Sequence, residues 1–453
     1  MSRSRTFSVV LCLLFAALPA LAQKPDGKGA LINDSRSSTN SQQYLTTEGP
    51  SQVGGKNLED WRKDLKSGDP SVRAAALTTI PHFGPAASKV VPDILACLHD
   101  NDASPRAKAA LAIRLMLPYI SPADYTRVIK DLGRSIKGDP QLIIRFESAR
   151  TYREFCRFCR PINHKIREEH DTLRDLVANV SLLSNSTFEL RDACIEALIY
   201  AGVDPQTGPE QFVTKALISR ANFQAEPTTQ VRLKAIMALG AMGRPQNPTD
   251  YQQVMEVLKS RNNYKSSHPT VRIWSHVAII ALDEKADKKD LDTIAEYLKD
   301  RKAEVKYQAV TALGALEDKA QAYVPNLCDM VLKRGGEDDP QVLTAICQSL
   351  GRMNNKGDNV KKALIQMTEH DDPKYADVVM GACVSLAQLG INDGEASTAI
   401  KKALEHRSFN EFQKAALKRA IEEAGKPKKP VKTPQKPEKG VAPGNRNPQQ
   451  NRR

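Results

Sequence analysis

Two cysteines and two histidines lie close together in one short segment of the chain. Cys156 and Cys159 stand three residues apart, and His164 and His170 follow them. Two thiolates and two imidazoles form a ligand set that tetrahedral zinc accepts. The spacing of the histidines is not that of the common zinc modules, which makes the pattern unspecific. These four residues are the metal-site candidates of the sequence.

The same segment has other interpretations. Five of its residues fall on one helical face and predict a buried apolar stripe that includes both thiols: Phe146, Ala149, Tyr152, Cys156 and Cys159. A local disulfide between the two cysteines is a second interpretation. A redox role is a third, but reactive cysteine pairs sit at helix N-termini, where the dipole lowers the thiol pKa, and this helix ends near Pro161. We assign no catalytic residue and expect no cofactor.

The elements that would position these residues are copies of one helical unit. A sequence motif recurs along the chain: a turn, a branched apolar residue, a basic residue and then a helix rich in small residues. We call this motif the repeated phrase. Its basic position can be followed at intervals of 33 to 46 residues, through Arg73, Arg106, Arg145, Arg191, Arg232, Arg272, Lys306, Leu343 and Val378. We call this the register position. A repeat of this length with helical spacing predicts an all-α fold, an α-solenoid of about nine helix pairs over residues 57–425.

The ends of the chain differ from the repeats in composition. Residues 1–22 have a basic start, a short apolar stretch and a small-x-small pattern ending at Ala22, which predicts a signal peptide cleaved there and an exported protein, periplasmic or secreted. An uncleaved N-terminal anchor is the alternative. Residues 23–56 are polar and predict a disordered linker, and residues 426–453 predict a basic, Pro-rich disordered tail. The mature chain has no other stretch suited to crossing a membrane.

The net charge of +13 belongs mostly to the tail, which holds nine basic residues and one acidic residue. The repeats are therefore nearly neutral, which argues against a specific nucleic-acid groove. The tail would be attracted weakly to anionic envelope polymers or lipid headgroups, or would serve as a solvated tail. Five cysteines lie among apolar residues of predicted helices and are expected to be buried: Cys97, Cys194, Cys328, Cys347 and Cys383.

Three short motifs carry a family resemblance. The segment Asp-Pro-Ser-Val-Arg at 69–73, then His-Phe-Gly-Pro-Ala-Ala at 82–87 and Val-Val-Pro at 90–92, resembles HEAT repeats, as found in many exported bacterial proteins. The resemblance implies that second helices line the inner face of a curved array. It also implies that the register cations bond to acidic turn residues of neighbouring repeats and form an internal ladder. Binding of a polyanion by these regularly spaced cations is the alternative.

The resemblance is specific for fold and unspecific for activity. HEAT-like deoxyhypusine hydroxylases hold a di-iron centre on His-Glu pairs, but none of the eight histidines here precedes a glutamate. HEAT-like bilin lyases act on cytoplasmic proteins that an exported chain would not meet. We therefore expect a non-catalytic scaffold that binds protein partners of unknown identity, with a metal-binding or redox protein and a polymer-binding tail as the alternatives.

Overall fold

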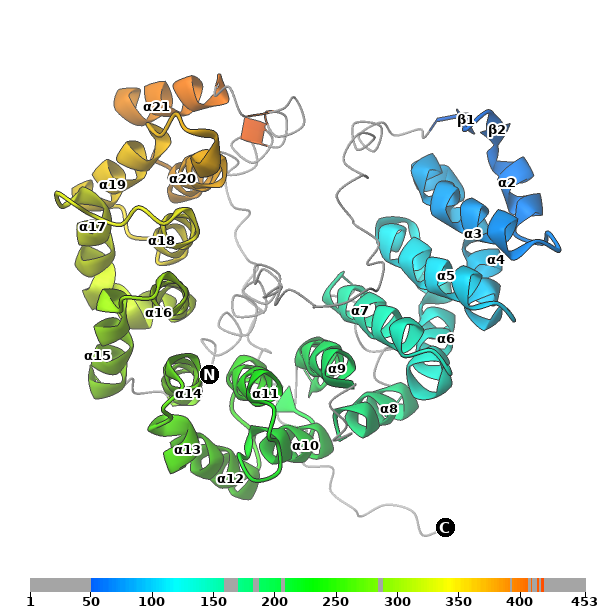
Figure 1. Ribbon diagram of the computed structural model, residues 1–453, viewed down its shortest axis with the longest axis horizontal. Coiled ribbons are helices and arrows are strands. Elements are labelled where there is room, and N and C mark those ends of the chain that lie inside the picture. The colour runs from blue at the N-terminus through cyan, green and yellow to red at the C-terminus, as the bar shows by residue number, and fades with distance from the viewer. Residues whose placement is uncertain are drawn as a thin grey trace, which may run out of the picture.

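The computed structural model describes residues 50–158, 170–181, 187–204, 208–283, 288–391 and 393–405, together with residues 409, 414, 417 and 418. Within them the chain forms nine consecutive helix pairs that curve into an arc (Figure 1). The fold is an α-solenoid, as the repeated phrase predicted. Among these residues no helix combines the length and apolar character that crossing a bilayer requires.

Each pair contributes one helix to an inner row and one to an outer row (Figure 1). The inner helices are α3 (Pro70–Thr79), α5 (Ala103–Leu115), α7 (Leu142–Phe158), α9 (Phe188–Ala201), α11 (Thr229–Met242), α14 (Pro269–Leu282), α16 (Ala303–Ala315), α18 (Pro340–Arg352) and α20 (Ala376–Leu389). The outer helices are α4 (Val91–Ala96), α6 (Tyr125–Gly138), α8 (His170–Val180), α10 (Gln211–Ala221), α12 (Pro248–Lys259), α15 (Lys288–Glu296), α17 (Val324–Leu332), α19 (Asp358–Thr368) and α21 (Gly394–Leu404).

Short elements connect or precede the pairs. They are the helices α2 (Leu58–Asp64) and α13 (Arg261–Tyr264), the hairpins β1 (Gln52–Val53) with β2 (Lys56–Asn57) and β3 (Val203–Asp204) with β4 (Gly208–Pro209), and the 3₁₀ segments η3 (Ile80–Val90), η4 (Cys97–His99), η5 (Leu117–Tyr119), η6 (Pro122–Asp124), η9 (Tyr297–Lys299), η10 (Glu317–Tyr323) and η11 (Pro373–Tyr375). The first hairpin spans the end of the segment 23–56 that we expected to be disordered and continues to Asn57. It is held because Trp61 Nε1 donates to the Val53 carbonyl at 2.9 Å.

Asp-Pro and related pairs start several helices in the way the sequence predicted. Asp69 and Asp339 accept hydrogen bonds from backbone N–H groups of the first turn, and the proline that follows each occupies a position whose N–H would have no partner. Asp139 differs. It follows the end of α6, and α7 begins three residues later; the Asp139 carboxylate accepts from the Gln141 backbone N–H and pairs with Arg106 of the preceding repeat.

The helices that carry the repeated phrase line the inner face of the arc, and the second helices lie outside (Figure 1). Our expectation that second helices line the inner face was therefore wrong. Side-chain size gives a reason: helices on the inner, shorter circumference must approach one another more closely, and several of these helices hold small residues at their contacts, such as Gly240, Gly314 and Gly351.

Contacts between consecutive inner helices show this close approach. A Cβ placed on Gly240 would lie 2.9 Å from Ala278 Cα, and one on Gly314 would lie 2.8 Å from Ser349 Cα. The Ser349 hydroxyl then donates to the Val310 carbonyl of the preceding inner helix at 3.0 Å. Small residues thus let the backbones meet and give the buried hydroxyl a partner.

One hydrophobic core runs through the array. Its buried apolar side chains extend continuously from Leu65 to Ala396, and a smaller cluster around Cys383 and Phe409 follows at the C-terminal end. A helix pair of this size buries its apolar surface only against its neighbours, so stability is shared between adjacent pairs.

Candidate interaction surfaces

Of the four predicted metal-site candidates, only the side chain of Cys156 lies in the part of the chain that the structure describes. Cys156 is buried in α7, as the apolar-stripe interpretation predicted, with 1% of its surface exposed. Cys159 and His164 lie outside the described residues. His170 begins α8, and its side chain is likewise outside the described part. Within the described residues, no group of three or more His, Cys, Asp and Glu side chains is placed to hold a metal.

The five other helical cysteines are buried, as predicted. Burial raises the thiol pKa to about 11 at Cys97 and Cys328 and to about 12 at Cys383. Burial also raises the pKa of Cys194 and Cys347. Thiols in this state are poor nucleophiles at neutral pH. They serve as small apolar side chains of the core.

The register cations form the predicted ladder in part. Arg73 binds both oxygens of Asp100 at 2.7 Å, and Arg106 binds Asp139 with Nε at 2.7 Å. Two further rungs follow the same pattern: Arg191 with Glu226, at 2.6 Å, and Lys306 with Glu337. In each case the carboxylate stands six residues before the next register position. These cations are committed to internal pairs, which leaves few of them for a polyanion.

Three register cations depart from this rule. Arg145 bonds to the neutral amide oxygen of Asn179. Arg272 Nε is buried without a hydrogen-bond partner, although Asp300 stands at the register distance. Arg232 is 3% exposed, and neither its Nε nor its Nη1 has a partner among the described residues.

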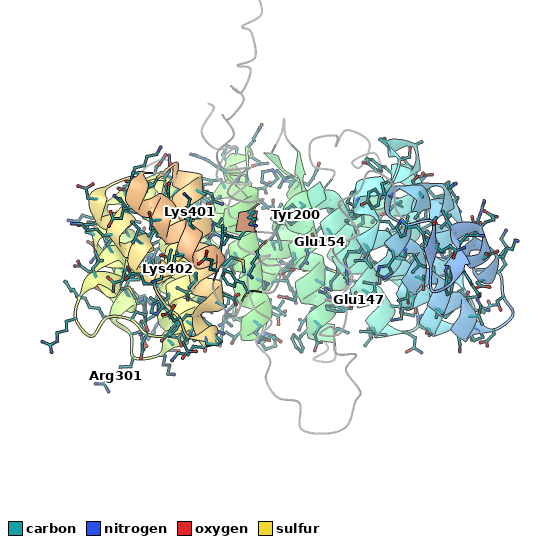
Figure 2. The ribbon with its side chains drawn as sticks, turned by 90° about the horizontal axis from the view of Figure 1, so that it is seen from above. Glu147, Glu154, Tyr200, Arg301, Lys401 and Lys402 are labelled. Carbon is teal, nitrogen blue, oxygen red and sulfur yellow. The ribbon has the colours of Figure 1, made fainter. Side chains whose placement is uncertain are left out.

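A second set of charges lies across neighbouring inner helices. Arg114 of α5 and Arg150 of α7 flank Glu147 of α7, at 2.9 and 3.2 Å. A second group on α7, α9 and α11 links Arg153 to Glu154 and Glu196, and Glu196 to Lys234. We call these two groups the inner-face network. Figure 2 shows the molecule from above, into the open side of the arc. Glu147, Glu154 and Tyr200 are labelled along the inner face, which we also call the inner wall.

One further carboxylate, Asp192 of α9, lies beside the network. Burial and the nearby Glu196 charge raise the pKa of Asp192 to about 6, against the attraction of Lys234, whose Nζ lies 3.6 Å away. The Asp192 side chain is partly buried, with 31% of its surface exposed. Protonation of Asp192 removes one negative charge from this part of the inner face.

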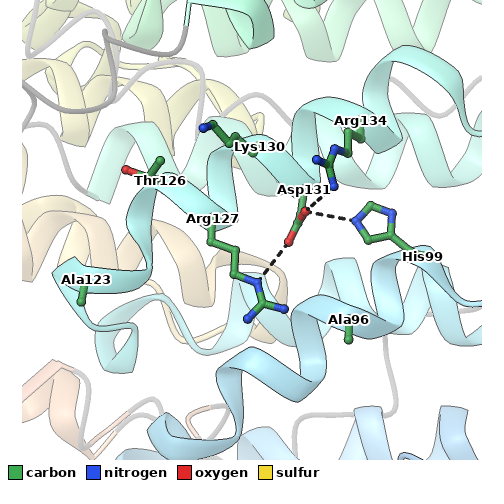
Figure 3. Close-up of a pocket in the computed structure, with 8 residues that line it drawn as sticks. All are labelled: Ala96, His99, Ala123, Thr126, Arg127, Lys130, Asp131 and Arg134. Atoms are coloured by element: carbon green, nitrogen blue, oxygen red, sulfur yellow. Dashed lines mark hydrogen bonds and ion pairs between the residues drawn. The ribbon is translucent and has the colours of Figure 1, made fainter.

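The outer row carries a basic groove of about 710 Å³ between α4 and α6 (Figure 3). Its lining residues are Ala96, His99, Ala123, Thr126, Arg127, Lys130, Asp131 and Arg134. Asp131 is the centre: its carboxylate lies 3.1 Å from His99 Nε2, 3.4 Å from Arg134 and 3.6 Å from Arg127. The Arg134 side chain keeps 70% of its surface exposed, so the rim of the groove presents positive charge to solvent.

Comparisons with known proteins give structural likenesses only. No protein-family model and no curated protein sequence matches the chain. Among solved structures, it is similar to an engineered protein, with a TM-score of 0.39 and 15% identity over 81% of this chain and 98% of the other. It is also similar to the karyopherin Kap121p, solved bound to the extreme C-terminus of the protein phosphatase Cdc14p, with a TM-score of 0.36 and 13% identity over 80% of this chain and 41% of the other. These likenesses are too low to carry an argument, and the fold is established by the helix pairing described above.

Sequence reasoning missed both the inner-face network and the outer groove. Arg127, Lys130 and Arg134 stand at helical spacing on one stripe, which was a readable signal for a basic surface. The partners of Glu196 lie 38 and 43 residues away in sequence, and only the stacking of α7, α9 and α11 brings them together.

Proposed function

We propose that this protein is an exported, non-catalytic scaffold of the HEAT-like class that holds a protein partner along the inner face of its arc. The inner-face network is the observation that carries the proposal. Charges of both signs lie along four consecutive inner helices. Several stay partly exposed, with 37% of the Arg150 side chain accessible, whereas Glu196 is buried. Such a surface suits a partner segment with the complementary order of charges, which supplies specificity more than raw affinity.

Charge reversal on the two faces tests the proposal. Arg150→Glu changes the inner wall, and Arg134→Glu makes the same change on the outer groove, where the side chain is exposed. We expect a partner captured by the wild-type protein from envelope extracts to be lost with Arg150→Glu and kept with Arg134→Glu, both variants having wild-type circular dichroism. Loss with Arg134→Glu alone would move the binding site to the outer row. Capture that neither variant weakens would contradict a charged docking face.

Export rests on the N-terminal segment and needs its own test. The proposal expects the mature protein to begin at Gln23, after cleavage at Ala22. N-terminal sequencing of protein isolated from the envelope and medium fractions checks this. A mature protein that still begins at Met1 would favour the uncleaved anchor.

A metal-binding or redox protein built on Cys156, Cys159, His164 and His170 stands as the second proposal, supported by the ligand types. Elemental analysis of the mature protein and of a Cys159→Ser variant tests it. Stoichiometric zinc or iron in the first and none in the second would support it.

Binding of anionic envelope polymers through residues 426–453 is a third proposal, supported by the charge of that segment. Retention on an anionic polysaccharide column should fall when the tail is deleted and when salt is raised. Unchanged retention without the tail would reject it.

A further inference from the structure

A buried cluster of charge lies where α9, α10 and α11 meet. Three arginines surround the single carboxylate of Glu226. Arg191 Nη1 and Arg220 Nη1 lie 2.6 and 3.6 Å from Glu226 Oε2, and the Arg232 guanidinium interacts electrostatically with the same carboxylate. Arg191 and Glu226 have no exposed surface, and Arg220 and Arg232 are 7% and 3% exposed. Guanidinium groups stay protonated in proteins, so the cluster holds three positive charges and one negative charge.

Several N–H groups of this cluster have no acceptor. They are Arg191 Nε, Arg220 Nη1 and, on Arg232, both Nε and Nη1. A buried charged donor without an acceptor is costly, and an unbalanced buried charge is more so. Arg232 contributes most of the deficit, since it makes no ion pair among the described residues. The ring centroid of Phe223 lies 4.9 Å from its guanidinium carbon.

The ladder explains why Arg232 has no carboxylate. The acidic partner of a rung stands six residues before the next register position, as Asp139 and Glu337 do. For Arg232 that position is Ser266. The equivalence is also structural. Asp139 accepts from the backbone N–H two residues later at 2.9 Å, and Ser266 Oγ accepts from His268 N at 3.2 Å in the same way.

The Ser266 hydroxyl keeps the hydrogen bond of the turn, but it lacks the negative charge and the two carboxylate oxygens that an acidic residue would offer to Arg232. We propose that the interrupted rung between Arg232 and Ser266 is a binding site for a small tetrahedral oxyanion, a phosphate or sulfate group. Its oxygens accept from the guanidinium donors of Arg232, and its charge offsets the excess of the cluster. This inference goes beyond the scaffold function and does not depend on it.

Phe223 lies beside the site. The residue is 50% exposed, and its ring centroid lies 4.9 Å from the Arg232 guanidinium carbon. An exposed aromatic side chain changes rotamer rapidly, so movement of this ring does not require the helix pair to unfold.

Thermal unfolding of the full mature chain in phosphate, sulfate and chloride buffers of equal ionic strength tests the site. We expect phosphate and sulfate to raise the midpoint and saturate at millimolar concentration, chloride to have little effect, and calorimetric titration with inorganic phosphate to give one site. Arg232→Met should abolish the rise. Ser266→Asp restores the missing carboxylate, so it should raise the midpoint in chloride and remove the response to phosphate.

Arg106→Met is the matched control, because Arg106 holds the same register position in an intact rung. It should lower the midpoint and keep the full response to phosphate. A phosphate response that survives in both Arg232→Met and Ser266→Asp would overturn the proposal. So would a wild-type protein that responds equally to chloride, or not at all.

Discussion

Replacing Glu226 by glutamine removes the one negative charge that the described residues place in the arginine cluster of α9, α10 and α11. Glutamine has nearly the same shape and keeps an oxygen for the Thr228 N–H, which Glu226 accepts at 2.9 Å. The change therefore isolates charge from packing. Breaking a buried pair by neutralising one partner costs about 3–5 kcal/mol, because the other charge stays buried and uncompensated. With Glu226 fully buried and three guanidiniums facing it, we expect Glu226→Gln to lose that much free energy of unfolding.

The assay must locate the loss as well as measure it. A solenoid transmits stability between neighbours, so urea denaturation should be joined with hydrogen exchange of the backbone amides. We expect exchange to rise in Phe188–Ala201 and Thr229–Met242 and to change little in Pro340–Arg352. Asp102→Asn is the control. Asp102 pairs with Arg73 at 2.9 Å, but its side chain keeps 52% of its surface exposed, so its loss should cost about 1 kcal/mol or less. Equal stability of the two variants would refute the reasoning about the buried cluster.

Three further predictions concern packing, pH and thiol reactivity. Gly314→Val should destabilise the protein by about 1–3 kcal/mol, because a Cβ at Gly314 meets the Ser349 backbone. Gly138 has open space around it, so Gly138→Ala should leave stability unchanged. Equal midpoints of the two variants in urea would contradict the close-packing argument. The raised pKa of Asp192, about 6 against 3.8, means that the folded protein gains a proton in this range and is stabilised as pH falls through it. Asp192→Asn should therefore be more stable than wild type at pH 8, and in urea titrations this advantage should shrink as pH falls through 6 toward 3.8; a variant less stable than wild type at pH 8 would contradict this. In the mature protein carrying Cys156→Ser and Cys159→Ser, the remaining thiols should resist Ellman's reagent at pH 8 until the protein is unfolded. Fast reaction of the native protein would show that burial is incomplete at Cys97, Cys194, Cys328, Cys347 and Cys383.

Much of the fold could be predicted from the sequence because each repeat contains local signals for where its helices begin and which face is apolar. Asp69 and Asp339, each followed by proline, start helices by the capping chemistry expected of them. The apolar residues at intervals of three and four predicted the helices between them. The choice of inner row could not be predicted in this way. In a periodic chain the boundary of the unit is arbitrary, so "first" and "second" helix have no meaning until side-chain size is compared between the rows.

The candidate surfaces were harder to predict, for a different reason. A charged residue on a helix looks the same in sequence whether it faces solvent or a neighbouring helix. Glu196 joins Arg153 and Lys234 only because three inner helices stack, and no local pattern encodes that contact. The interrupted rung is the exception. Once Asp139 and Glu337 fix the distance of six residues, the sequence alone shows that Ser266 breaks the series.

Two devices hold consecutive inner helices together, and they do not coincide everywhere. Between α16 and α18 both are present, since Gly314 packs on Ser349 and Lys306 pairs with Glu337. Between α11 and α14 the close packing remains, with Gly240 against Ala278, but the ionic rung is missing. Packing alone fixes how near two helices lie, whereas a rung between turns also resists their rotation about the contact. The junction of α11 and α14 is thus the place where a bound oxyanion would change the stiffness of the arc, and with it the fit of a partner along the inner face.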